Sequence, residues 1–76
     1  MPILRKVSGQ EAIKVLCNKF GFQITGRKGS HVRLSKTIEN GKIGTVIPVH
    51  KELKIGTLKA ILKQANILEE EFSKFL

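Results

Sequence analysis

The sequence has no aspartate, tryptophan or tyrosine, and only one cysteine among its 76 residues. The lone Cys17 cannot form an internal disulfide, and no Cys/His cluster has the spacing of a zinc site. All six acidic residues are glutamates that are scattered or lie near the C-terminus, which disfavours paired-carboxylate catalysis and a carboxylate-bound divalent ion. We therefore expect a protein of a reducing compartment that uses neither a metal nor another cofactor.

Long apolar segments are also missing. No run of about 18 or more apolar residues could span a membrane, and no long basic helix carries an aromatic apolar face. The first residues, Met1 to Lys6, lack the apolar core of a secretory signal, so we expect a cytoplasmic protein. The length predicts one domain over residues 1–76, with a thin core and no deep pocket for a small metabolite.

Positive charge is the largest bulk feature of the sequence. Lysine and arginine number 14 against the six glutamates, which gives a net charge of +8 and an isoelectric point near 10.1. Because three glutamates lie together at 69–71, residues 1–68 hold 13 basic and only three acidic side chains. Such an excess attracts polyanions, of which nucleic acid is the commonest, although a basic surface that serves solubility alone remains an alternative.

The first helix is predicted to begin at Ser8, because this hydroxyl can cap the helix while Glu11 reaches back to the amide of Ser8. Apolar residues at i, i+3, i+4 and i+7 then form one stripe, which consists of Ile13, Leu16, Cys17 and Phe20. Gly21 suits the left-handed residue that ends a helix. Cys17 is interpreted as a core residue, since a reactive thiol needs an exposed electropositive niche.

Three strands are predicted after this helix, because the periodicity changes to two. Residues 22–25 and 31–35 alternate apolar and polar side chains, residues 45–47 are β-branched, and residues 26–29 form a basic loop between the first two segments. The order of the strands in the chain and the short connections favour antiparallel pairing.

Asn40-Gly41 is the strongest hairpin signal, because both residues tolerate the positive φ of a type I′ turn. With these two residues as the loop, the register of the whole hairpin follows. Six apolar residues then share one face, namely Val32, Leu34, Ile38, Ile43, Ile47 and Val49. The same register predicts that His31 lies opposite His50 on the other face.

A second helical stripe consists of Leu58, Ile61, Leu62 and Ala65, with Asn66 as the C-terminal stop. A short last helix is predicted from Glu69 to Leu76, with acidic side chains at its positive end. The order α-β-β-β-α with a short extra C-terminal helix predicts an α+β two-layer sandwich. Helices would cover one face of a three-stranded antiparallel sheet and leave the other face open.

Histidine is the default group for proton transfer at neutral pH, and this chain has only two. RNA cleavage suits so short a list, because a base need only take the proton from a 2′-hydroxyl, which then attacks the adjacent phosphate. The basic residues nearest His31 in sequence could stabilise the developing charge, and they are Arg27, Lys28, Arg33 and Lys36. From the sequence pattern alone, the alternative that His31 is an ordinary polar residue on a solvated strand face stays open.

The second histidine, His50, has two interpretations. Opposite His31 it could protonate the leaving 5′-oxygen or orient the substrate; otherwise it is a strand-end residue bonded to the following loop. A Ser-His-acid triad through Ser30 is poorly supported, because neighbouring strand residues point to opposite faces. Few aromatic side chains are available to stack on bases, so recognition of RNA backbone and shape fits best.

An ordered set of short motifs resembles the HicA family of toxins, also called YcfA-like, over about residues 8–72. The motifs are Ser8-Gly9, Gly21-Phe22, Gly29-Ser30-His31, Val46-Ile47-Pro48-Val49-His50, Lys51-Glu52-Leu53 and Gly56-Thr57-Leu58 followed by Ile61-Leu62. The resemblance implies a double-stranded-RNA-binding-domain-like fold and an mRNA interferase, an endoribonuclease that arrests translation. It also implies a HicB-type antitoxin, encoded beside the toxin, which neutralises the toxin by covering its active site.

Carried over residue by residue, the catalytic histidine of that family falls on His31, and Gly29 and Ser30 hold the other two places of its motif. We expect the RNA to be bound by basic residues, namely Arg27, Lys28, Arg33, Lys36, Lys51, Lys54, Lys59 and Lys63. Two alternatives remain: a non-catalytic double-stranded-RNA-binding module, and a protein whose basic face docks an acidic partner.

Overall fold

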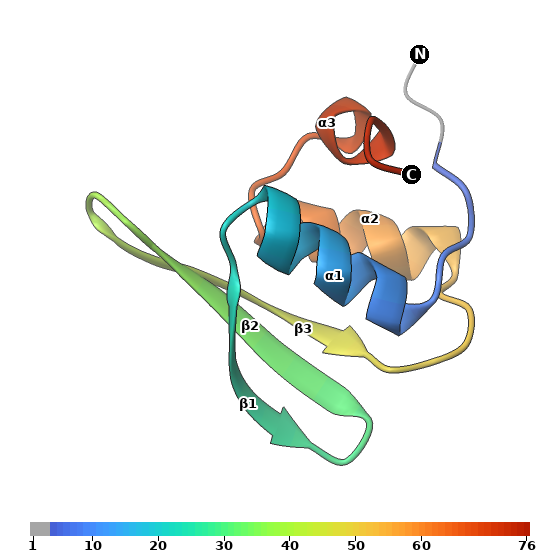
Figure 1. The fold of residues 1–76 in the computed structure, drawn as a ribbon, viewed down its shortest axis with the longest axis horizontal. Helices are drawn as coiled ribbons and strands as arrows, with labels where there is room; N and C mark the ends of the chain where they lie inside the picture. The colour runs from blue at the N-terminus through green and yellow to red at the C-terminus, as the bar shows by residue number, and fades with distance from the viewer. Residues whose placement is uncertain (1–3) are drawn as a thin grey trace.

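The chain folds into a helix, three strands and two further helices. The computed structural model describes residues 4–76, in which α1 spans Gly9–Lys19, β1 Gln23–Lys28, β2 His31–Ile38, β3 Gly41–Pro48, α2 Ile55–Gln64 and α3 Glu69–Ser73. The strands form one antiparallel sheet in the order β1-β2-β3. Figure 1 shows α1 and α2 on the same face of this sheet, with α3 on the far side of these helices. The predicted α+β architecture is confirmed.

No helix within residues 4–76 is long and apolar enough to cross a membrane. The prediction that the chain has no secretory signal rests on residues 1–6, and residues 1–3 of this segment lie outside the described residues.

The core lies between the sheet and the two longer helices. All four residues of the stripe predicted for α2 are buried, namely Leu58, Ile61, Leu62 and Ala65. In α1 the buried residues are Gly9, Ala12, Val15 and Leu16. Of the predicted stripe, Leu16 is fully buried, while Ile13, Cys17 and the cap residue Phe20 are partly buried and pack against the core. The predicted α1 stripe is therefore correct at Leu16 and in its contact with the core, but the most deeply buried stripe is centred about one residue earlier. Two overlapping apolar stripes have the same spacing, and only packing on the sheet selects one.

Side-chain and backbone caps set the ends of the helices. The hydroxyl of Ser8 accepts a hydrogen bond from the amide of Glu11 at 2.9 Å, as predicted, whereas the carboxylate of Glu11 accepts one from Arg5 at 2.8 Å. Gly21 follows α1 with φ +76° and Asn66 follows α2 with φ +58°, which confirms both predicted stops. The positive φ at these two positions reverses the chain and leads it back toward the core.

The register of the β2–β3 hairpin differs by two residues from the predicted one. The loop consists of Glu39 and Asn40, and Gly41, with φ +146°, already pairs with Ile38. Asn40 does not have a positive φ, so the predicted type I′ turn at Asn40-Gly41 is wrong. Because side chains alternate with a period of two, a shift of two changes every partner but leaves each residue on its predicted face.

The apolar faces of the strands are buried only where the helices cover them. Val32, Leu34 and Ile47 are buried, but Ile38 is 40% exposed because the tip of the hairpin extends beyond the helices (Figure 1). In β1, Phe22 precedes the strand and is buried, whereas Ile24 is 58% exposed next to a β-bulge between Ile24 and Gly26. The six residues predicted to share one face of the β2–β3 hairpin do share it, but the helices bury this face only at its centre.

Backbone contacts fix the N-terminus of α1 to the end of β3. The amide of Gly9 donates to the carbonyl oxygen of His50 at 2.8 Å, and the amide of Leu53 donates to the carbonyl oxygen of Val7 at 2.7 Å. A Cβ on Gly9 would overlap the carbonyl oxygen of Pro48 and lie 2.9 Å from the Cα of Val49. Only glycine allows the two backbones to approach so closely.

We predict that Gly9→Ala lowers the free energy of unfolding by at least about 2–3 kcal/mol, because the added methyl group forces α1 away from β3. Chemical denaturation measures the change. Gly56→Ala is the matched control: Gly56 is also near the start of a helix, no atom lies within 4 Å of its Cβ position, and alanine there should raise stability by up to about 1 kcal/mol. Equal effects of the two substitutions would contradict this account of the helix contact.

Candidate functional site

His31 is the first residue of β2 and directly follows the turn formed by Gly29 and Ser30. Its cross-strand partners are Lys28 on β1 and Pro48 on β3. Residues directly opposite each other project from the same face of the sheet, with Cβ atoms about 4.5–5.5 Å apart. Because the next residue of β2 is buried under the helices, the exposed imidazole of His31 lies on the open face, as predicted.

Backbone interactions hold the turn that carries His31. Gly29 has φ +60°, in the left-handed region that favours glycine, and its carbonyl oxygen accepts from Nε of Arg27 at 3.3 Å. The carbonyl oxygen of Ser30 accepts from the amide of Val49 at 2.6 Å. The main chain beside His31 is thus anchored to β3, although the side chain itself is exposed.

Arg33 lies two residues further along β2 and therefore on the same face as His31. Its partners are Gly26 on β1 and Val46 on β3. A hollow of about 230 Å³ is lined by Gly26, Arg27, Lys28, Arg33 and Val46. Because Gly26 has no side chain, the hollow stays open between the two cations of Lys28 and Arg33. Lys28 is also the cross-strand partner of His31, so the hollow lies next to this histidine.

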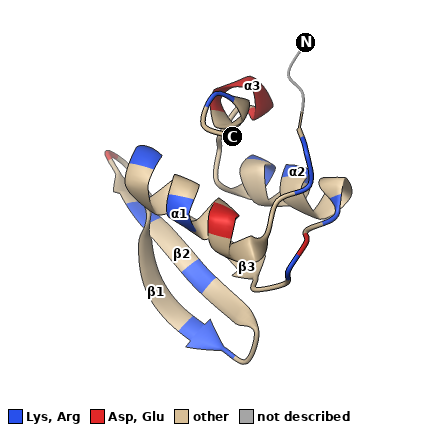
Figure 2. Cartoon of the chain, turned by 45° about the vertical axis from the view of Figure 1, so that its right-hand side comes forward, with Lys and Arg blue, Asp and Glu red and all other residues tan. Residues whose placement is uncertain are grey.

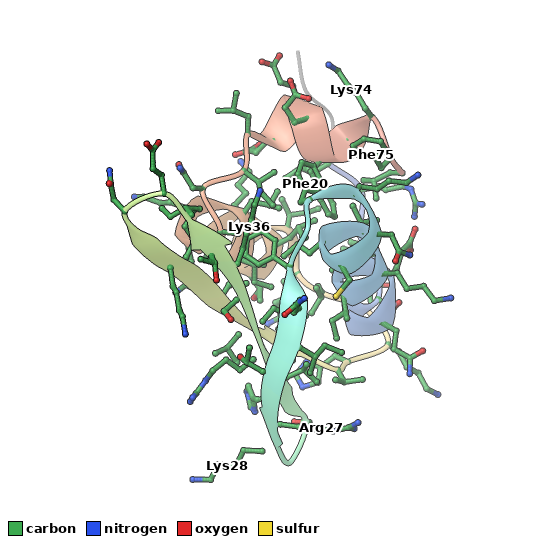
Figure 3. All side chains as sticks on the ribbon, turned by 60° about the vertical axis from the view of Figure 1, so that its left-hand side comes forward. Phe20, Arg27, Lys28, Lys36, Lys74 and Phe75 are labelled. Carbon is green, nitrogen blue, oxygen red and sulfur yellow. The ribbon has the colours of Figure 1, made fainter. Side chains whose placement is uncertain are left out.

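Figure 3 shows Arg27 and Lys28 at the tip of the β1–β2 hairpin, away from the helices. Lys36, in contrast, pairs with Ile43 and projects toward the helices, where its Nζ lies 6.0 Å from the ring centroid of Phe22. It is five residues from His31 along β2, about 16 Å at the usual rise of a strand. The structure therefore brings Lys28 and Arg33 to His31 but leaves Lys36 on the other face.

His50 is exposed, but it lies two residues beyond the partner of His31 in β3. The prediction that the two histidines are cross-strand neighbours is wrong, because the hairpin loop lies at residues 39–40 and not 40–41, which shifts the partner of every residue by two. The carbonyl oxygen of His50 accepts from α1, so its backbone has a structural role.

The remaining predicted basic residues form separate groups. Lys51 and Lys54 are exposed in the segment between β3 and α2. Lys59 and Lys63 are exposed on α2 and line a hollow of about 430 Å³, which is bounded on its other side by residues 66–69. α3 carries Glu69, Glu70 and Glu71 in its first turn. Figure 2 shows the acidic part of α3 at the end of the molecule opposite the β1–β2 turn. The strongest acidic charge therefore lies away from His31.

The site offers one exposed imidazole and two nearby cations, an arrangement suited to proton transfer on an anionic substrate. Cys17 is a poor alternative nucleophile, because burial raises the pKa of its thiol and so reduces the thiolate fraction. Within residues 4–76, no group of three or more His, Cys, Asp or Glu side chains could hold a metal ion. Sequence analysis did not identify Gly26 and Val46 as neighbours of the site; a correct strand register would have found both as partners of Arg33.

The sequence model that describes the HicA toxins of bacterial toxin–antitoxin systems matches residues 9–67. The match begins with α1, contains the whole sheet and the turn at residues 29–31, and ends just after α2. α3 lies outside it. No curated protein and no solved structure matches the chain.

We predict that Gly29→Ala lowers the free energy of unfolding by about 1–2 kcal/mol, because an L-residue resists the left-handed backbone of this turn. No atom lies within 4 Å of the Cβ position, so the cost is conformational and not steric. Gly29→Asn should recover part of the loss, since asparagine tolerates this region, and denaturant titrations compare the variants. If the alanine and asparagine variants are destabilised equally, the positive φ at position 29 is not the reason why glycine stabilises this turn.

Proposed function

The chain belongs to the HicA toxin family of bacterial toxin–antitoxin systems, and from this premise we propose that it is an endoribonuclease whose catalytic base is His31. As a toxin of such a system it has a cognate antitoxin, which we expect to be of the HicB type. The observation that carries the proposal is the position of His31 on the open sheet face, between Lys28 and Pro48 and in line with Arg33.

In the proposed reaction, the neutral imidazole of His31 takes the proton from an RNA 2′-hydroxyl. The 2′-oxygen then forms a bond to the adjacent phosphorus, and the bond from phosphorus to the 5′-oxygen breaks. The products are a 2′,3′-cyclic phosphate and a 5′-hydroxyl end, whose proton comes from the imidazolium or from water. Lys28 and Arg33 stabilise the charge that builds on the phosphoryl oxygens during this displacement.

This scheme requires neither a second histidine nor a metal ion. The register removes His50 from the place opposite His31, where it would have protonated the leaving oxygen. Because His31 is exposed, water has access to the leaving group. A general base of this kind contributes roughly 10²–10⁴-fold to the rate.

The open face suits a long anionic substrate better than a small metabolite, since three of the five residues that line its hollow are basic, namely Arg27, Lys28 and Arg33. We expect Arg27, Lys28 and Arg33 to contact the RNA next to the scissile phosphate, with Lys51 and Lys54 as further contacts along the chain. Lys59 and Lys63 on α2 extend the basic surface away from the sheet.

We predict that His31→Ala abolishes RNA cleavage and growth arrest, with a loss of at least about 100-fold in rate, while RNA binding and antitoxin binding persist. The assay is run in excess chelator, in which the wild-type protein should remain active. His50→Ala, which changes the other exposed histidine, is the matched control and should cleave at nearly the wild-type rate.

Undiminished cleavage by His31→Ala would refute the mechanism, and a strict requirement for magnesium would argue against a histidine-only scheme. RNA binding without any fragments from the wild-type protein would instead identify a non-catalytic double-stranded-RNA-binding module.

A second prediction separates the two faces of β2. In a His31→Ala background, Arg33→Gln should make the negative slope of log affinity against log salt shallower by about 0.7–0.9, because one phosphate contact is lost. Lys36→Gln removes a cation from the same strand but from the helix side, so its effect on the slope should be much smaller. Equal slopes for both variants would show that RNA does not bind specifically to the open face.

A further inference from the structure

The outer edge of β3 is an exposed strand edge that differs from the other edge of the sheet. The order β1-β2-β3 leaves β1 and β3 as the two edges. β1 is bent by its bulge and ends in Arg27 and Lys28, and both bulges and charges protect a strand edge from further pairing. β3 pairs with β2 along all eight of its residues without irregularity, and none of residues 43–47 is charged.

The register identifies which backbone groups of β3 face outward. The amide of Val49 donates to the carbonyl oxygen of Ser30, so this pair is a hydrogen-bonded one. Because hydrogen-bonded and non-hydrogen-bonded pairs alternate in an antiparallel ladder, residues 43, 45 and 47 bond to β2. The amide and carbonyl groups of Lys42, Gly44 and Val46 therefore point away from the sheet, toward solvent.

A hollow of about 490 Å³ lies along this edge and is lined by Arg33, Gly44, Thr45, Val46 and Gln64. On the open face, Val46 is 41% exposed and Gly44 adds no side chain. On the helix side, the hydroxyl of Thr45 donates to Oε1 of Gln64 at 2.9 Å, so this hydroxyl already has an acceptor. The edge thus offers an accessible groove in which outward backbone groups lie beside one exposed apolar side chain, Val46, and one cation, Arg33.

We propose that the β3 edge binds an extended segment of the cognate antitoxin, which adds as a fourth strand along residues 42–46 and directs an acidic side chain toward Arg33. The alternating donors and acceptors of the edge match another polypeptide backbone, whereas outward carbonyl oxygens would repel the phosphates of RNA. The net charge of +8 favours an acidic partner and opposes pairing with a second copy of the same chain.

This proposal rests on the proposed function only in requiring an antitoxin; it does not require His31 to be catalytic. An added strand would lie about 10 Å from β2, at the usual spacing of neighbouring strands. A long acidic side chain from it can neutralise Arg33 without touching His31. The antitoxin would in this way remove a cation that the RNA needs.

Hydrogen exchange of the backbone amides, measured by NMR on the full chain, tests the proposal. The probe is the purified small protein encoded by the reading frame next to that of the toxin. On binding, the amides of Lys42, Gly44 and Val46 should exchange at least about tenfold more slowly. The amides of Ile43 and Thr45, which bond to β2, should be protected with or without the probe and serve as internal controls.

A complex in which the amides of Lys42, Gly44 and Val46 keep their free exchange rates would overturn the proposal. Protection of these amides in the protein alone, together with dimer formation, would assign the edge to a second copy. Protection on addition of RNA would assign it to nucleic acid. None of these outcomes depends on cleavage, so failure of the proposed nuclease activity is recognised separately.

A matched pair of substitutions provides a second test. Val46→Pro removes the outward amide, whereas Val46→Ala removes only the side chain. Thermal unfolding of both variants verifies that they fold. We expect Val46→Pro to raise the Kd for the antitoxin at least about tenfold relative to Val46→Ala. Equal Kd values for the two folded variants would rule out backbone pairing at this edge.

Discussion

The backbone of α1 meets the backbone of β3 at Gly9, with no side chain between them. This contact fixes the end of β3, and the next residue, Val49, donates to the carbonyl oxygen of Ser30. Ser30 immediately precedes His31, so the position of the imidazole depends on a chain of main-chain contacts that starts at the helix. In this way a chain with so thin a core holds an exposed side chain at a defined place.

One face of the sheet forms the core and the other carries the proposed site. The alternation of side chains along β2 assigns each of its residues to one of these two faces. Val32 and Leu34 close the core under the helices, while His31 and Arg33 project from the open face. Each role constrains only every second residue. Stability and the proposed chemistry can therefore share one strand without competing for the same positions.

Little further machinery is needed for the proposed reaction, because the RNA supplies the nucleophile and the protein supplies one base and a positive field. The acidic residues of α3 lie at the opposite end of the molecule, where they weaken that field least (Figure 2). The proposed binding of the antitoxin at the β3 edge acts on the same field, since it neutralises Arg33 on the sheet face that carries His31.

Local patterns in the sequence were sufficient to predict the helix ends at Ser8, Gly21 and Asn66, the α2 stripe and the face of β2 that carries His31. Each depends on the chemistry or spacing of neighbouring residues. The pairing of His31 with Pro48 and the buried stripe of α1 were decided only by the tertiary structure. A period of two cannot distinguish registers that differ by two residues, and overlapping stripes in a helix have equal periodicity. The pairing of β2 with β3 resolves the first ambiguity, and packing of α1 on the sheet resolves the second.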